Sequence, residues 1–235
     1  MTHVRVIGPG RAGSALLTAL TACGWATSSL GRDDDLTDAA SGVDLLVIAT
    51  PDPVIADVAA AVTPRPDAVV AHLAGSLGLD VLAAHPRRAA LHPLVALPDG
   101  PTGARRLADG AWFAVAGDAI VERVVADLGG TSFTVADDDR AAYHAAAVIA
   151  SNHVVALLGQ AQRVGATAGV PFEALLRLVQ GTVDNVVELG PFAALTGPAA
   201  RGDGVTIARH LAALPFDERA TYEAMADEAR RLAGR

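Results

Sequence analysis

Residues 4–20 read V-R-V-I-G-P-G-R-A-G-S-A-L-L-T-A-L, an apolar run followed directly by a glycine-rich turn and a helix-forming segment. The first four residues are mostly apolar and β-branched, which is typical of a strand that is buried on both faces. The segment from Ser14 to Leu20 carries good helix formers with apolar residues at helical spacing. The sequence therefore predicts a strand, a tight turn and a helix in immediate succession.

The turn has the spacing G-x-G-x-x-G at residues 8–13. Its first glycine permits a tight turn, its second lets the backbone approach a pyrophosphate, and its third lets helix and strand pack closely. The start of the helix also offers unpaired N–H groups and a partial positive charge to phosphates. A glycine-rich turn without a ligand is the alternative. We predict dinucleotide binding by Gly8, Pro9, Gly10, Arg11, Ala12 and Gly13.

Composition limits the class of protein. The chain has 235 residues, of which 51% are hydrophobic and 19% charged, so we expect a compact globular protein. A formal net charge of −8 argues against a nucleic-acid partner or an anionic membrane surface. No apolar run approaches about 18 residues, and the N-terminus does not resemble a signal peptide. The single cysteine, Cys23, is expected to be buried and fits a reducing cytoplasm.

The first part of the chain alternates predicted strands with predicted helices. Strands are expected at residues 26–30, 44–49, 68–73, 111–115 and 131–135, and helices at 54–62 and 119–128. This alternation predicts a parallel, doubly wound sheet. The segment 31–42 is short for a connecting helix, so we expect an abbreviated crossover there.

From residue 138 onward the strands stop and helical periodicity takes over. Helices are expected at about 138–168, 172–189, 205–214 and 216–233, with Gly169-Val170-Pro171 breaking the first from the second. We therefore predict a Rossmann-like α/β domain at residues 1–137 and an all-α domain at residues 138–235. In such proteins the ligand lies beyond the carboxyl ends of the strands, so we expect the helical domain to close over it.

The residue that selects NAD or NADP is expected at the end of the second strand, where Arg32 precedes three aspartates. An arginine accommodates a 2′-phosphate, whereas an acidic residue hydrogen-bonds a ribose hydroxyl, so we favour NADP. The alternative is that Arg32 pairs with one of the aspartates, which would also repel a phosphate. The ends of two further strands complete the predicted cofactor site with Thr50, Pro51, Gly75 and Ser76.

Reduction of a carbonyl or imine requires a proton donor and groups that orient the substrate. His92, before a proline, is one candidate donor, and packing of a turn is its alternative role. At 100° per residue, Ser151 lies within about 20° of His144 around the long helix, and Asn152 within about 80°. We predict that His144 and Asn152 are catalytic and that Ser151 contacts the substrate. An interhelical hydrogen bond is the alternative for Asn152.

The glycine-rich loop at residues 196–204 is the last candidate. Arg201 could clamp a carboxylate through two parallel hydrogen bonds, with Thr196 and Asp203 as further substrate contacts. The alternative is a tight turn in which Asp203 caps the next helix. Scattered histidines and one cysteine argue against a metal site, and no G-x-S-x-G elbow supports a hydrolase.

The chain contains no lysine, and all 18 basic residues are arginine. A Schiff base on a lysine side chain is therefore excluded, as is proton donation by a lysine.

Several of these segments resemble known families. The glycine turn, residues 44–52 and His92-Pro93-Leu94 resemble the 6-phosphogluconate dehydrogenase-like superfamily. The helical half resembles the Rossmann-like, domain of unknown function 2520 family. The segments that carry this second resemblance are Tyr143–Ala147, Ser151-Asn152, Thr182–Asn185, Ala194–Pro198 and Arg201–Asp203.

That family is similar to pyrroline-5-carboxylate reductase and ketopantoate reductase. The resemblance implies an NAD(P)H-dependent reductase of a small 2-oxo acid, with ketopantoate as the best single substrate, and a homodimer formed through the helical domain. A cyclic-imine reductase and a non-catalytic dinucleotide sensor remain alternatives. The lysine that related dehydrogenases use on the interdomain helix is absent, so their mechanism does not transfer to this chain.

Overall fold

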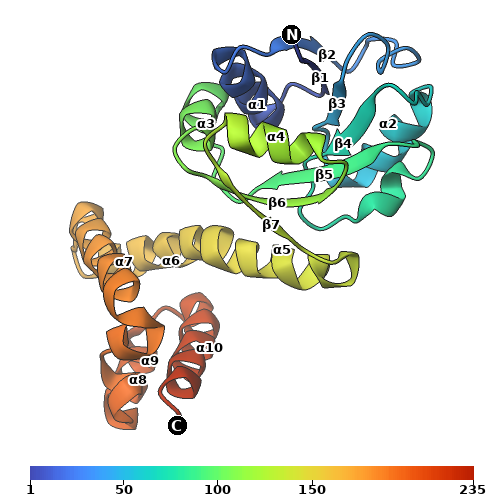
Figure 1. The fold of residues 1–235 in the computed structure, drawn as a ribbon. Coiled ribbons are helices and arrows are strands. Elements are labelled where there is room, and N and C mark those ends of the chain that lie inside the picture. The colour runs from blue at the N-terminus through green and yellow to red at the C-terminus, as the bar shows by residue number, and fades with distance from the viewer. The chain divides into compact units, whose positions relative to one another are not determined.

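The computed structural model describes residues 1–235, which form two compact units, Met1–Ser151 and Asn152–Arg235 (Figure 1). We predicted a boundary after residue 137, whereas the contacts divide the chain 14 residues later, after Ser151. The difference arises because the first turns of the long helix belong to the first unit. Arg140 is fully buried there, and the Tyr143 ring packs against His92.

The first unit is built on a seven-stranded sheet in the order β2-β1-β3-β4-β5-β6-β7. All neighbouring strands are parallel except β5 and β6, which are antiparallel. The predicted α/β class is therefore confirmed, whereas the antiparallel pair was not predicted. The strands are β1 (His3–Ile7), β2 (Ala26–Leu30), β3 (Leu45–Ile48), β4 (Val69–His72), β5 (Arg88–Pro93), β6 (Trp112–Gly117) and β7 (Thr131–Thr134). We did not predict β5, because its alanines and terminal proline have low strand propensity.

The helices of the first unit cover both faces of the sheet (Figure 1). The helices that pack on the two faces are α1 (Arg11–Ala22), α2 (Ile55–Ala61), α3 (Gly100–Leu107) and α4 (Ile120–Asp127), with the short turns η1 (Asp52–Val54), η2 (Leu79–Leu82) and η3 (Asp137–Asp139). Helix α5 (Arg140–Val148) also belongs to the first unit. Helix α3 was not predicted. No helix lies between β2 and β3, as the short segment 31–42 implied. Cys23, expected to be buried, is exposed at the end of α1.

Alternation along the strands creates two apolar clusters. In β3, Leu45 and Val47 pack with α1, α3 and α4, whereas Leu46 and Ile48 pack with α2 on the opposite face. All four side chains are fully buried. Successive strand residues point to opposite faces, so a strand covered on both sides must be apolar throughout. This requirement explains the uninterrupted apolar runs in the sequence.

The predicted helix over 138–168 is broken into three parts. Helix α5 (Arg140–Val148) leads into a π-helical turn, η4 (Ile149–His153), which is followed by α6 (Val154–Thr167). A π-helical turn inserts an extra residue, so the 100° spacing does not hold across Ser151 and Asn152. The predicted common face of His144, Ser151 and Asn152 was therefore derived from the wrong helical geometry.

One helical stretch, Asp137–Thr167, is long and apolar enough to cross a membrane, with a hydropathy of 1.4. None of the residues in the most apolar part of this stretch is buried inside the structure. Length and composition alone are weak support for a span. The buried Arg140 near its start ties it to the first unit, and η4 interrupts it with polar residues.

The second unit is entirely helical, as predicted. After α6 it contains α7 (Phe172–Ala194), α8 (Pro198–Arg201), α9 (Gly204–Ala213) and α10 (Phe216–Leu232). Helix α7 is kinked at Gly190, whose φ is 77°. The buried apolar core of the second unit contains only Ala199, Ile207 and Ala226. Many apolar side chains of α6 and α7 are exposed instead: Val154, Val155, Leu176, Leu178, Val183, Val186, Val187, Leu189 and Phe192.

Gly117, at the end of β6, provides a test of the antiparallel pairing. Its φ is +87°, and a Cβ there would lie 2.2 Å from the Arg88 carbonyl oxygen. Gly110 also has a positive φ, +68°, but nothing lies within 4 Å of its Cβ position. We expect Gly110→Ala to lower the free energy of unfolding by about 1 kcal/mol, and Gly117→Ala by about 3 kcal/mol. Urea denaturation measures both, and equal losses would contradict the close approach of β5 and β6.

Candidate dinucleotide-binding and catalytic site

The glycine turn between β1 and α1 has the geometry that its sequence predicts. Gly8 has a φ of +83°, and its N–H donates to the Leu30 carbonyl at 2.9 Å. A Cβ on Gly13 would lie 2.6 Å from the Gly8 carbonyl oxygen and 2.9 Å from Val6 Cγ1. Both positions therefore require glycine for local packing, whether or not a ligand binds.

Gly10 is different, because nothing in the chain occupies the space beside it. No atom lies within 4 Å of its Cβ position, and α1 begins there with no side-chain cap on its first N–H groups. Those groups are donors that a helix leaves without internal partners. Open space beside uncapped N–H groups at a helix start fits the pyrophosphate of a dinucleotide.

The adenosine end of the predicted site lies after β2. Arg32 is exposed and forms no ion pair. The Asp34 carboxylate accepts a hydrogen bond from the Gly31 N–H at 2.6 Å, and Asp35 accepts one from the Thr37 N–H at 2.9 Å. Two of the three neighbouring aspartates are therefore engaged with the backbone, and Arg32 remains accessible to an anionic group.

Several predicted residues come together at the carboxyl edge of the sheet. A Cβ on Gly75, after β4, would lie 2.7 Å from His144 Nδ1 and 2.9 Å from His92 Nε2. Nearby, the Ser76 hydroxyl donates to the Asp52 carboxylate at 2.8 Å. The structure therefore brings His92, at the end of β5, and His144, on α5, against the loop that follows β4.

Tyr143, which sequence reasoning missed, joins this group. Its hydroxyl lies 2.5 Å from His92 Nδ1, and the two rings are nearly perpendicular, at 86°. The ring centroids of His92 and His144 are 6.0 Å apart. The only available signal was the position of Tyr143 next to His144 on an otherwise alanine-rich helix.

Unpaired buried polar atoms concentrate around this edge. Thr50 Oγ1, His144 Nδ1 and both terminal nitrogens of Arg140 lack a hydrogen-bond partner, and His85 is the only other residue in this class. Leaving a buried polar group unpaired costs about 1–3 kcal/mol. Such groups are rare in folded proteins and are typical of sites that a ligand completes.

Burial, with a smaller effect of the charges around it, decides the protonation state of His92. Burial lowers the pKa of His92 to about 4, and the nearby His144 and Arg140 act in the same direction, whereas Asp52 opposes them. Burial raises the pKa of Tyr143. At neutral pH the site therefore holds a neutral imidazole hydrogen-bonded to a protonated phenol.

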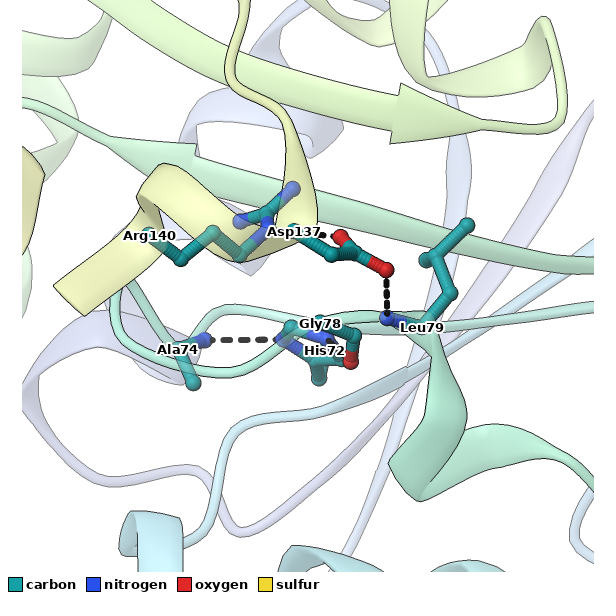
Figure 2. A network of polar contacts seen from close by, with 6 residues as sticks. All are labelled: His72, Ala74, Gly78, Leu79, Asp137 and Arg140. Atoms are coloured by element: carbon teal, nitrogen blue, oxygen red, sulfur yellow. Dashed lines mark hydrogen bonds and ion pairs between the residues drawn. The ribbon is translucent and has the colours of Figure 1, made fainter.

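A polar network ties the start of α5 to the loop after β4 (Figure 2). Arg140 Nε donates to Asp137 Oδ1 at 3.2 Å, and Asp137 Oδ2 accepts the Leu79 N–H at 3.3 Å. Under this pair, His72 Nδ1 accepts the Ala74 N–H at 3.2 Å, and its Nε2 lies 3.2 Å from the Gly78 carbonyl.

This network has no direct sequence signature, and we did not predict it. The run of three aspartates before Arg140 resembles a solvated helix start, and only the i, i+3 spacing of Asp137 and Arg140 indicates an ion pair. Because the network fixes both ends of the loop, it also holds Gly75 and Ser76 at the site.

The remaining predicted residues lie at or beyond the end of the first unit. The Ser151 hydroxyl donates to the Ala147 carbonyl at 2.8 Å, and Asn152 begins the second unit. Asp203 caps α9, since its two oxygens accept from Thr206 N at 2.9 Å and Thr206 Oγ1 at 2.7 Å. The capping alternative therefore describes Asp203, whereas Thr196 and Arg201 are exposed.

Comparisons with known proteins agree with this fold. Residues 114–229 match the family described as "Domain of unknown function (DUF2520)". No curated protein matches the chain by sequence. A candidate NADP oxidoreductase from Bacteroides fragilis superposes with a TM-score of 0.80 at 20% identity, covering 98% of each chain.

Two structures with bound ligands are also similar. One is a reductive aminase from Aspergillus terreus in complex with NADPH4, cyclohexanone and allyl amine, with a TM-score of 0.74 at 17% identity over 98% of this chain and 94% of that one. The other is a Plasmodium falciparum pyrroline carboxylate reductase with NADP bound, with a TM-score of 0.66 at 14% identity over 99% and 98% of the two chains. These matches confirm the predicted fold, a Rossmann-like α/β part followed by a helical part, over nearly the whole chain.

The glycine turn yields a matched pair of variants. Gly10→Ala adds a Cβ in open space, so we expect unchanged stability but at least a tenfold loss of NADPH affinity, because the methyl group occupies the predicted pyrophosphate position. Gly13→Ala is expected to lower the free energy of unfolding by about 1–3 kcal/mol through its clash with Gly8. Fluorescence titration with NADPH and urea denaturation measure the two effects. Unchanged NADPH affinity in Gly10→Ala would contradict the predicted site.

Proposed function

Because this chain carries a DUF2520 domain on a Rossmann-like fold, we propose that it is an NADPH-dependent reductase of a small carbonyl or imine compound. The observation that carries the proposal is the set of groups at one edge of the sheet. An uncapped helix start with open space beside it lies after β1, and a neutral His92 paired with Tyr143 lies at the end of β5. The NADP and NADPH named with similar structures support the same class of cofactor.

When bound, the dinucleotide would supply the hydride. Residues 10–13 would hold its pyrophosphate through backbone N–H groups, and Arg32 would meet the 2′-phosphate. Toward the nicotinamide, the unpaired Thr50 hydroxyl and the Gly75-Ser76 segment, with Pro51 beside it, would complete the cofactor site. The buried, unpaired hydroxyl of Thr50 fits a ligand that brings its own polar groups.

On the substrate side, His92 and His144 are the candidate proton donors, since both rings lie against Gly75 at the carboxyl edge of the sheet. Asn152, Ser151 and Arg201 remain predicted substrate contacts, with Arg201 holding a carboxylate. A 2-oxo acid, with ketopantoate first, is the substrate that the family resemblance implies.

A cyclic or acyclic imine is the second candidate. Two similar structures are named as a reductive aminase and a pyrroline carboxylate reductase, which supports imine chemistry on this fold. An imine can reach the site already protonated, so its reduction requires less from a protein that contains no lysine.

The decisive experiment measures NADPH consumption by the purified chain with ketopantoate and with a cyclic imine. Turnover of one and not the other assigns the substrate class. Rescue of a pantothenate auxotroph that lacks ketopantoate reductase would support ketopantoate in cells. Tight NADPH binding without turnover of any oxo acid or imine would contradict a reductase and favour a sensor.

Arg32 tests the cofactor preference. We expect Arg32→Ala to raise the KM for NADPH about tenfold and to leave the KM for NADH unchanged, because only NADPH carries the 2′-phosphate. Arg65→Ala is the matched control, since Arg65 precedes the amino end of β4, away from the predicted site. Equal effects of Arg32→Ala on both cofactors would exclude Arg32 from the 2′-phosphate.

We also propose that the chain is a cytoplasmic homodimer joined through its helical unit. Exposed apolar side chains on α7 support this, since the second unit buries only three apolar residues by itself. Val187 on α7 is 82% exposed, and Val205 on α9 is 73% exposed.

Light scattering after size exclusion tests the dimer. Val187→Asp should give monomers, whereas Val205→Asp, a similar change outside α7, should leave the dimer intact. A monomeric unmodified chain would contradict the proposal, and recovery in the membrane fraction would favour a membrane role for residues 137–167.

A further inference from the structure

We propose that Tyr143 is a positioning residue, which fixes the tautomer of His92 and replaces, at Nδ1, the proton that the His92 ring gives to the carbonyl oxygen of a substrate at the carboxyl edge of the sheet. The proposal rests on the reductase function proposed above. It deepens that function, because it assigns His92 as the group that delivers the proton and Tyr143 as the group that supplies it.

The acid and base strengths of the two groups determine the direction of their hydrogen bond. The Tyr143 hydroxyl lies 2.5 Å from His92 Nδ1, and this is the only hydrogen bond that the hydroxyl makes. A phenol O–H is a stronger acid than the N–H of a neutral imidazole, and an imidazole nitrogen is a stronger base than a phenol oxygen. The hydroxyl therefore donates to Nδ1, and the ring proton lies on Nε2.

The Nε2–H then points at the site. A Cβ on Gly75 would lie 2.9 Å from His92 Nε2 and 2.7 Å from His144 Nδ1, so only a glycine lets the two rings approach this loop. His92 Nε2 makes no hydrogen bond inside the chain, and its proton is available to a ligand. The arrangement is a neutral donor aimed at the edge where the nicotinamide is expected.

The surrounding charges keep both partners in the required states. Burial lowers the pKa of His92 to about 4, the positive charges that His144, Arg140 and His72 can carry act in the same direction, and Asp52 opposes them. Burial raises the pKa of Tyr143, and the Arg140 guanidinium acts against this rise. The imidazole is therefore neutral and the phenol protonated at pH 7, and Arg140 stabilises the phenolate if it forms.

The relay balances for a carbonyl substrate. The dinucleotide, when bound, would supply the hydride to the carbonyl carbon, and His92 Nε2 would give its proton to the carbonyl oxygen, which takes the C=O π electrons. The electrons of the Nε2–H bond stay on the ring while Nδ1 takes the proton of the Tyr143 hydroxyl. His92 ends as the other neutral tautomer, Tyr143 as a phenolate, and water reprotonates the phenolate. Neither an imidazolate nor an imidazolium forms.

The variant Tyr143→Phe removes the hydroxyl and keeps the ring that packs edge-on against Phe133, with centroids 5.7 Å apart. The chain also contains a matched control. In the second unit the Tyr222 hydroxyl lies 2.6 Å from His210 Nδ1, with nearly perpendicular rings, and this pair lies outside the predicted site. Tyr222→Phe should therefore change His210 and leave His92 unaffected.

Nitrogen-15 NMR of the histidine rings in the full chain tests the tautomer directly. We expect His92 to be a neutral Nε2–H ring at pH 7 in the unmodified protein and in Tyr222→Phe, and a mixture of the two neutral tautomers in Tyr143→Phe. If His92 is an imidazolium or carries its proton on Nδ1 in the unmodified protein, this spectrum alone overturns the proposal.

Kinetics tests the relay. With a 2-oxo acid, Tyr143→Phe should lower kcat about tenfold to a hundredfold with little change in KM, whereas Tyr222→Phe should change neither. An unchanged kcat would overturn the relay. Failure of the protein to bind NADPH would instead overturn the proposed function, while the NMR result on His92 would still decide the tautomer.

Discussion

Parallel pairing of β1, β3, β4 and β5 is the constraint on which the rest of the first unit depends. The register pairs Ile7 with Ile48 and Ile48 with His72, so these strands end at nearly the same level. Whatever follows each strand must therefore meet at one edge. Residues far apart in sequence, such as Gly8, Gly75 and His92, come to that edge because their strands run in the same direction.

The same edge is where the structure departs most from ordinary packing. Elsewhere in the first unit the buried side chains, apart from those of His72 and His85, are apolar and pack in two clusters, whereas here a complete guanidinium, that of Arg140, is buried with only its Nε paired. A buried charge with incomplete pairing lowers stability, so its presence indicates a role other than stabilising the fold. Its effect on Tyr143 and His92, and its link through Asp137 to the loop after β4, are consistent with such a role.

The two units differ in how they obtain their stability. The first covers both faces of a sheet, so its core closes within one chain. The second has long helices and a core of three small or medium apolar residues, with the Arg163–Glu218 ion pair beside it. An ion pair with one exposed partner adds little stability. The helical unit is therefore the part of the chain that gains most from covering its apolar side chains.

The sequence by itself determined the strand-turn-helix start, the α/β class, the helical second part and most of the glycine turn. These follow from local rules: apolar periodicity, glycine spacing and helix boundaries each act within a few residues. The predicted common face of His144, Ser151 and Asn152 rested on α-helical spacing, whereas the structure has a π-helical turn at Ile149–His153, which a 100° rule cannot detect. The sequence also left the role of Asp203 open between a helix cap and a substrate contact, because the same carboxylate can serve either role, and the structure shows the cap. Only the tertiary structure paired Tyr143 with His92 and buried Arg140 beside them, because these contacts join α5 to strands whose residues lie about 50 positions away in the chain.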